Sequence, residues 1–387
     1  MKKKIEWTAG KWLTNTNQAI RSKKSTIFAI NMKQILFFLF IFSTANAQFS
    51  VDADYLYGKI IPHNQTIKHL IVNHPEGVLL SFNKKTFGEE EWQSNFNFPD
   101  YGFSLHHQAN KNQVLGDLYG VYGHYNFYFL NRNLVFRIGQ GIAYNTNPYD
   151  KNDNFRNLAY STKLMPSTYF LLNYRKEKII GDLGFQTGFT FFHHSNANIK
   201  SPNTSTNTLS FQLGLNYVFE DEIAEYKFLN DTLKRTYPLK YNIVFRTGIN
   251  ESDIIGSGQK PFYELSFYAD KQFAKKSKMQ LGVDLFAMYY LKEYIKFKSV
   301  AYPNELIDAD TDFKRIGLFT GYELLLNKFS LEAQVGYYLY SPFDFLGPFY
   351  QRIGTKYHWN KTVFSSLSLK THAAKAEALE FGIGIKL

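Results

Sequence analysis

The sequence predicts an all-β protein built as an antiparallel transmembrane β-barrel, and three observations carry this prediction. Aromatic residues make up 18% of the chain, and aromatic and β-branched residues fit pleated sheets better than helices. From Gln48 onward, apolar and polar residues alternate in segments of about ten residues separated by polar turns, which is typical of membrane barrel strands. After residue 47 the sequence contains no apolar run of about 18 residues that would suit a transmembrane helix.

The last segment shows the alternation most clearly. Apolar side chains occupy every second position from Leu379 to Leu387, and Gly382, Gly384 and Lys386 lie between them. A soluble sheet seldom has glycines at successive inward positions, because its core needs volume. We therefore expect a polar, roomy lumen that these glycines face.

Connection lengths support a barrel of about fourteen strands, within a range of about twelve to sixteen. Short polar turns are expected in the periplasm and longer loops outside. The longer loops expected outside are 146–163, 195–206, 251–260, 292–312 and 341–348. Two further stretches, 86–99 and 220–239, fall where periplasmic turns are expected but are too long for them, and the sequence gives no reason for their length.

Residues 32–47 have the features of a secretory signal peptide. They contain a basic start, an apolar core, and the small-x-small site Ala45-Asn46-Ala47. Because this segment begins at an internal methionine, we expect residues 1–47 to be an N-terminal extension plus signal peptide. Residues 48–387 would then form the barrel domain, exported to the bacterial outer membrane.

Charge and cysteine content exclude several classes of function. The net charge of +11 comes mainly from residues 1–47, since the remainder holds 36 basic and 32 acidic residues and no long basic cluster. We therefore expect no nucleic-acid partner. The chain has no cysteine, which excludes disulfides and thiolate metal sites. Because His106, His107 and His124 have no partner at metal-ligand spacing, we expect neither a metal nor a cofactor.

One segment contains polar residues suited to chemistry. In 183–198 the odd positions are mainly apolar, and His193 and Ser195 continue this parity, so both are expected to face lipid at the outer end of a strand. Asn207 has the same parity in the next strand. Since residues i and i+2 share a strand face, and neighbouring strands pair, the three side chains are expected to meet. His194 has the opposite parity and is expected in the lumen or a loop.

The combination of nucleophile, base and orienting group suits acyl transfer. His193 would take the proton of Ser195 as the hydroxyl attacks an ester carbonyl, and would return it to the leaving alcohol. Asn207 would hold the imidazole, and Asn196 is the candidate donor to the developing oxyanion. The expected reaction is therefore ester hydrolysis.

These residues resemble the lipid A 3-O-deacylases, the PagL-type acyloxyacyl hydrolases of the outer membrane. The likeness rests on a short motif, the loop after it and a polar residue twelve positions past the serine: His193-x-Ser195-Asn196, Pro202-Asn203 and Asn207. It implies Ser195 as nucleophile, His193 as base, Asn196 at the oxyanion position, and lipid A of lipopolysaccharide as substrate. Where the family has a glutamate this chain has Asn207, which can fix the imidazole tautomer but cannot stabilise an imidazolium by charge.

Two functions stay open at this point. The first is a membrane-embedded ester hydrolase acting on lipid A. The second is a non-enzymatic barrel, either a pore or a degenerate family member. The second is motivated by Asn207 in place of a carboxylate and by a chain more than twice as long as a small eight-stranded barrel needs.

Overall fold

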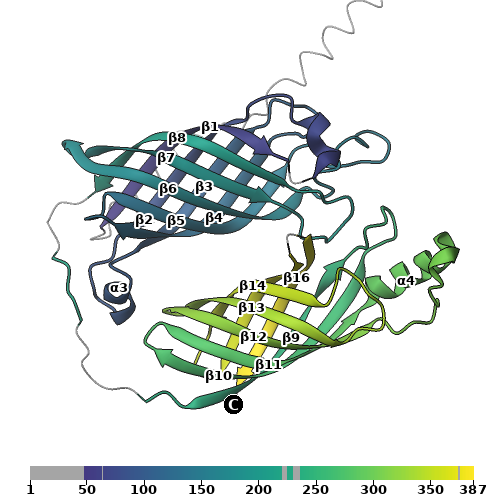
Figure 1. Cartoon of the computed structure of the whole chain (residues 1–387). Coiled ribbons are helices and arrows are strands. Elements are labelled where there is room, and N and C mark those ends of the chain that lie inside the picture. Colours follow the sequence, from purple (N-terminus) through teal and green to yellow (C-terminus); the bar gives the residue numbers. More distant parts are fainter. Residues whose placement is uncertain (1–47, 63, 220–224, 230–235, 374) are drawn as a thin grey trace, which may run out of the picture. The chain divides into compact units, whose positions relative to one another are not determined.

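The computed structural model describes residues 48–387 except 63, 220–224, 230–235 and 374 (Figure 1). The predicted extension and signal peptide, residues 1–47, lie outside the described residues. The described chain forms sixteen strands, which close into two antiparallel barrels of eight strands each. No helix in this part of the chain is long and apolar enough to cross a bilayer.

In the first barrel each strand pairs with its neighbours in sequence, and β1 closes the barrel by pairing with β8. Its strands are β1 (Phe49–Ile61), β2 (Glu76–Lys84), β3 (Asp100–Ala109), β4 (Leu118–Phe129), β5 (Leu134–Asn145), β6 (Leu164–Ile180), β7 (Leu183–His194) and β8 (Thr206–Phe219). The β1–β2 connection contains the 3-10 helix η1 (Gln65–Leu70), and the β2–β3 connection contains α3 (Glu91–Asn95).

The second barrel follows the same plan, and β16 closes it by pairing with β9. Its strands are β9 (Leu239–Asn250), β10 (Lys260–Ala274), β11 (Ser277–Met288), β12 (Lys314–Leu326), β13 (Phe329–Tyr340), β14 (Phe349–His358), β15 (Val363–His372) and β16 (Lys375–Lys386). Between β11 and β12 lie α4 (Tyr289–Ala301) and η2 (Pro303–Glu305). Figure 1 shows α4 at one end of this barrel.

The fold class is the predicted one, and sixteen strands lie within the expected range. The arrangement differs from the single barrel expected over 48–387. Side chains alternate in the same way in one large barrel and in two small ones, so the alternation does not reveal where a barrel closes. The closing pairs join the first and last strands of each barrel, which lie far apart in the sequence.

The two stretches too long for periplasmic turns have different roles in the structure. The stretch 220–239 spans the connection between β8 of the first barrel and β9 of the second. The stretch 86–99 contains α3 and packs against that connection. Tyr226 contacts Phe87 and Phe98, with ring centroids 5.2 and 4.7 Å apart. The long β2–β3 connection therefore packs against Tyr226 in the described part, 225–229, of the segment that links the barrels.

Charged side chains fill the lumen of the first barrel. Arg137 and Arg175 are both buried and share the carboxylate of Asp52, at 2.7 and 2.8 Å. In the same lumen, the rings of Tyr169 and Phe192 stack with their centroids 5.0 Å apart. The lumen is polar, as expected, but protein side chains occupy it.

The second barrel has a larger buried charge network. Arg352 pairs with Asp284 at 3.0 Å and with Glu380 at 2.7 Å. Lys356 pairs with Glu332 at 2.8 Å. All five of these side chains are buried, so inward-facing ion pairs occupy this lumen too.

The inward glycines near the C-terminus make room for neighbouring side chains. A Cβ added at Gly384 would lie 2.2 Å from the ring of Phe364, and one added at Gly382 would lie 2.2 Å from the Ser366 hydroxyl oxygen. The expectation of a roomy lumen is therefore wrong at these positions. Glycine is required here because side chains of β15 pass over the backbone of β16.

Replacing Asp52 with alanine is expected to destabilise the first barrel by about 3–5 kcal/mol, because Arg137 and Arg175 would stay buried without their shared counter-charge. Urea unfolding of the purified protein in detergent micelles measures this change. The matched control is Glu76→Gln, which breaks an exposed ion pair with Lys111 and should alter the unfolding midpoint little. An alanine variant as stable as the parent would contradict the role given to Asp52.

Candidate functional site

Strands β7 and β8 bring His193 and Asn207 together on the outer wall of the first barrel. The two residues are directly opposite in register, and His193 Nδ1 lies 2.7 Å from Asn207 Oδ1. On β7, Phe189 shares the face of His193 and is exposed, whereas Phe192 and His194 face inward and are buried. The imidazole and the amide therefore contact each other on the outward face of the strands, which the alternation of apolar and polar residues predicts to face lipid.

The hydrogen bond to Asn207 fixes the tautomer of the imidazole. A carbonyl oxygen only accepts, so with Asn207 Oδ1 as partner the Nδ1 atom of His193 carries the proton. In the neutral ring the Nε2 atom then holds a lone pair, which is the form that a general base requires. The amide achieves this orientation without adding a charge.

Ser195 is the first residue beyond β7, and only 6% of it is exposed. Strand alternation does not set its direction, because the ladder ends at His194. Its hydroxyl oxygen accepts hydrogen bonds from Ala197 N at 3.1 Å and from Asn203 Nδ2 at 3.0 Å. Within the described chain the hydrogen bonds of this hydroxyl go to its own loop and none goes to His193.

Asn196 is fully buried and holds the loop together. Its Nδ2 atom donates to Ser161 Oγ at 2.8 Å and to Lys200 O at 2.7 Å. A carboxamide nitrogen has two protons, so both are engaged within the protein. Its backbone N–H donates to Asn203 Oδ1 at 3.0 Å. The Asn196 side chain therefore links two loops and has no further proton to offer an oxyanion.

The connection between β5 and β6 supports the loop that follows β7. Ser161 Oγ, which accepts from Asn196, donates to Lys200 O at 2.7 Å. Nearby, the backbone N–H of Thr204 donates to Leu158 O at 3.0 Å. These bonds tie the two outer loops along several residues and limit the positions that Ser195 can adopt.

A buried tyrosine of the β5–β6 connection also bonds to the start of β8. The Tyr160 hydroxyl bonds to the Thr206 hydroxyl at the start of β8. Burial raises the pKa of Tyr160, so the phenol stays protonated at physiological pH. The loop is thus fastened at its end as well as at Asn196.

Two residues of this site were not assigned by the sequence. Asn203 belongs to the family-like Pro202-Asn203 pair, but its contact with Ser195 depends on how the loop folds. Ser161 lies in an outer loop, where neither periodicity nor a motif marks it. Among the described residues, no group of three or more His, Asp or Glu side chains is placed to hold a metal ion.

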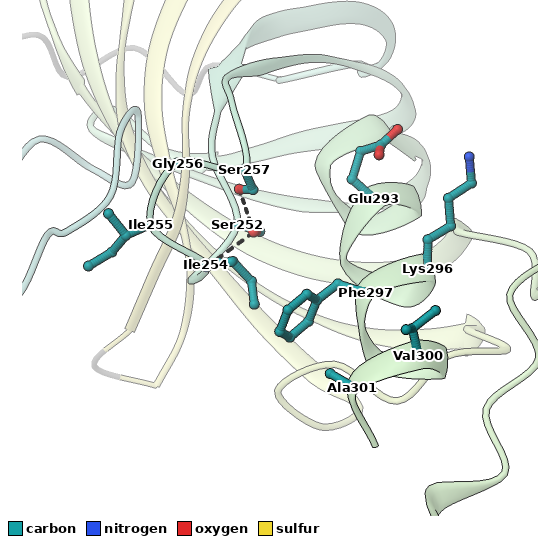
Figure 2. Close-up of a pocket in the computed structure, with 10 residues that line it drawn as sticks. All are labelled: Ser252, Ile254, Ile255, Gly256, Ser257, Glu293, Lys296, Phe297, Val300 and Ala301. Carbon is teal, nitrogen blue, oxygen red and sulfur yellow. Dashed lines mark hydrogen bonds between the residues drawn. The ribbon is translucent and has the colours of Figure 1, made fainter. Parts of the chain in front are cut away.

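A pocket of about 440 Å³ lies in the second barrel, between the β9–β10 connection and α4 (Figure 2). Figure 2 shows Phe297 extending from α4 toward Ile254, while the side chains of Glu293 and Lys296 point away from Ile254. The full lining consists of Ser252, Ile254, Ile255, Gly256, Ser257, Glu293, Lys296, Phe297, Val300 and Ala301. No site residue predicted from the sequence lines this pocket.

Replacing Ser161 with alanine is expected to speed amide hydrogen exchange in residues 196–205 about tenfold, because the hydroxyl links Asn196 to Lys200. Asn196→Ala should have a similar effect, because each single variant removes two of the three hydrogen bonds among Ser161, Asn196 and Lys200, and the double variant, which removes all three, should exchange faster than either one. Hydrogen-exchange mass spectrometry of the full-length protein measures this, with Thr187→Val as the control. Exchange at the parental rate in both single variants would contradict the link.

Several solved structures of membrane proteins are similar to the chain at low identity. They include the outer membrane protein Omp33 of Acinetobacter baumannii, with 8% identity, 88% of this chain and 97% of that chain covered, and a TM-score of 0.17. A porin variant from Rh. blastica has 8% identity, coverage of 88% and 100%, and a TM-score of 0.19. At these TM-scores the fold assignment rests on the strand pairing of this chain and not on the likenesses.

Two sequence-family models match this chain. Residues 76–216 match the sequence model of the family described as lipid A 3-O-deacylase (PagL). Residues 239–387 match the family described as acyloxyacyl hydrolase, C-terminal domain. No curated protein matches the chain in sequence. The two family matches fall one on each barrel and together cover most of the chain, which therefore belongs to the lipid A 3-O-deacylase (PagL) family of ester hydrolases.

Proposed function

We propose that this protein removes a 3-O-linked acyl chain from lipid A in the outer membrane, with Ser195 as nucleophile, His193 as general base and Asn207 as the group that orients the base. The observation that carries the proposal is the hydrogen bond between His193 and Asn207 on the outer wall. Family membership supplies the ester hydrolase class and lipid A as the substrate.

The position of the pair favours a membrane lipid as substrate. Polar groups in apolar surroundings cost roughly 1–3 kcal/mol each when they are unsatisfied. His193 and Asn207 form a hydrogen bond to each other on this wall, and the polar ester region of a membrane lipid would lie against the same wall. A base on the outer wall therefore suits an ester that arrives from within the membrane.

The first chemical step is attack of Ser195 Oγ on the ester carbonyl carbon. For this step the hydroxyl proton turns from Asn203 Oδ1, to which it donates at 3.4 Å, to His193 Nε2, since catalytic hydrogen bonds often align only when substrate is bound. His193 takes the hydroxyl proton as the new C–O bond forms, and delivers it to the sugar oxygen as the ester bond breaks. Water then attacks the acyl-serine in the same way and releases the fatty acid.

We assign the oxyanion donor to Asn203. Its Nδ2 atom lies 3.0 Å from Ser195 Oγ, so it is near any oxygen bonded to the carbon that Ser195 attacks. The sequence suggested Asn196 for this role, but both of its amide protons are donated within the loops. In our proposal Asn196 positions the loop and Asn203 contacts the reacting atoms.

The alternative function, a passive pore, has less support. Buried ion pairs occupy the lumen of each barrel, including Asp52 with Arg175 in the first and Arg352 with Asp284 in the second. A pore would need an open path along the barrel axis, and these side chains lie across it. The polar groups on the outer wall, by contrast, have no role in a pore.

Replacing Ser195 with alanine is expected to abolish acyl release, because the other groups cannot form the acyl-enzyme. Mass spectrometry of lipid A from cells that express the parent or the variant measures the loss of the acyl chain, and the urea midpoint shows whether the fold is retained. If the variant deacylates lipid A as fast as the parent, Ser195 is not the nucleophile. Unaltered lipid A with the parent, together with single-channel conductance, would favour the pore.

Replacing Asn207 with aspartate is expected to raise kcat about fivefold to tenfold. The two side chains have the same shape, and a hydrogen bond to a charged group contributes about 1 kcal/mol more than a neutral one, so the carboxylate would stabilise the imidazolium that forms on His193. Asn207→Leu, which removes the acceptor, should lower kcat instead. Initial rates of fatty acid release at neutral pH measure both changes, and an aspartate variant slower than the parent would count against this orienting role.

A further inference from the structure

A row of polar side chains extends from the His193–Asn207 pair around the outer wall of the first barrel. Thr168 of β6 is opposite His193, and Gln140 of β5 is opposite Thr168. All four side chains point outward: Gln140 is exposed and the other three are half-buried. We call Gln140, Thr168, His193 and Asn207 the polar row.

Apolar residues surround the polar row. Beyond Asn207 the register continues to Ile61 of β1. The neighbouring outward positions along the same strands are Ile138, Ile142, Pro166, Phe170, Phe191 and Leu209. The row is therefore a narrow band of hydrogen-bonding groups in a wall that otherwise suits lipid.

The hydrogen bonds of Gln140 leave part of its amide available. Thr168 Oγ1 donates to Gln140 Oε1 at 2.6 Å, and Gln140 Nε2 donates to Ser167 O at 3.2 Å. A carboxamide offers two protons and two acceptor lone pairs. Within the described chain, one proton and one lone pair of Gln140 thus remain for a partner outside the protein. Such a partner must itself contain a donor and an acceptor.

The row ends at a gap in the layer of outward side chains. Gly123 of β4 is opposite Gln140, and a Cβ built at Gly123 would meet nothing within 4 Å. The next residue in register is Phe103 of β3, which is exposed. A flat polar group can therefore lie against the backbone at Gly123 while it contacts Gln140.

We propose that Thr168, Gln140 and the gap at Gly123 form a subsite for the amino sugar that bears the ester. In an acylated 2-amino sugar, an amide group is attached to the carbon next to the 3-O-ester, and an amide matches the remaining proton and lone pair of Gln140. Neighbouring strands lie roughly 5 Å apart, so Thr168 is one strand and Gln140 two strands from His193. This inference rests on the proposed function, because the ester must lie at Ser195 and His193 for the amide to reach Gln140.

The first test compares two substrates with the full-length protein in micelles: lipid A, and a p-nitrophenyl ester of a fatty acid, which has no amide. Gln140→Ala and Thr168→Val are each expected to lower kcat/KM for lipid A about tenfold relative to the simple ester. The control is Thr187→Val, an outward threonine of β7 whose hydroxyl donates to Gln212 O, and it should leave the ratio of the two rates unchanged. An unchanged ratio in the Gln140 and Thr168 variants would overturn the subsite.

The second test fills the gap. Gly123→Val adds a side chain where the structure has open space, so the urea midpoint should stay at the parental value. The KM for lipid A is expected to rise several-fold, since the valine would occupy the position assigned to the sugar. A stable variant with an unaltered KM for lipid A would show that the sugar does not lie there.

A binding measurement separates this inference from the proposed function. In the Ser195→Ala background, which forms no acyl-enzyme, the Kd for lipid A is measured with and without Gln140→Ala, and an increase of about fivefold to tenfold is expected. If the parent has no hydrolase activity but Gln140→Ala still weakens binding, the subsite stands and the proposed reaction fails. If the parent is active but neither Kd nor the rate ratio responds to Gln140→Ala, the subsite fails and the reaction stands.

Discussion

Closure of the backbone hydrogen-bond ladder is the constraint on which the rest of this structure depends. A strand in contact with lipid has no water to bond its N–H and C=O groups, so an antiparallel sheet in a membrane must close on itself. In this chain the ladder closes twice, through β8 with β1 and through β16 with β9. Closure requires a defined total stagger of the strands, and the register of each strand pair decides which side chains share a level on the outer wall.

The small size of each barrel determines what its lumen contains. Eight strands enclose a space just wide enough for side chains. The two barrels fill it with buried ion pairs such as Arg175 with Asp52 and Arg352 with Glu380. Removing one partner of such a pair leaves a buried charge without its counter-charge. Chemistry at the lipid surface is therefore left to outward-facing side chains and to the loops at the rim.

Strands and loops position different groups of the candidate site. Paired strands place the imidazole of His193 against Asn207, and the same register aligns Thr168 and Gln140 beside them. The hydroxyl of Ser195 lies beyond the ladder, where hydrogen bonds from Ala197 and Asn203 of its own loop hold it. The base is therefore as rigid as the barrel wall, while the nucleophile can turn between Asn203 and His193 during the reaction we propose.

The sequence by itself determined the fold class, the approximate strands and the outward parity of His193 and Asn207, because alternation along a strand is a local property of the chain. It did not determine that the strands close as two barrels, because closure depends on pairing between strands far apart in the sequence. Nor did it determine the direction of Ser195 or the role of Asn196. The direction of Ser195 follows from contacts with Ala197 and Asn203 of its own loop, and the role of Asn196 follows from its contact with Ser161 of another loop. Only the folded chain brings these residues together.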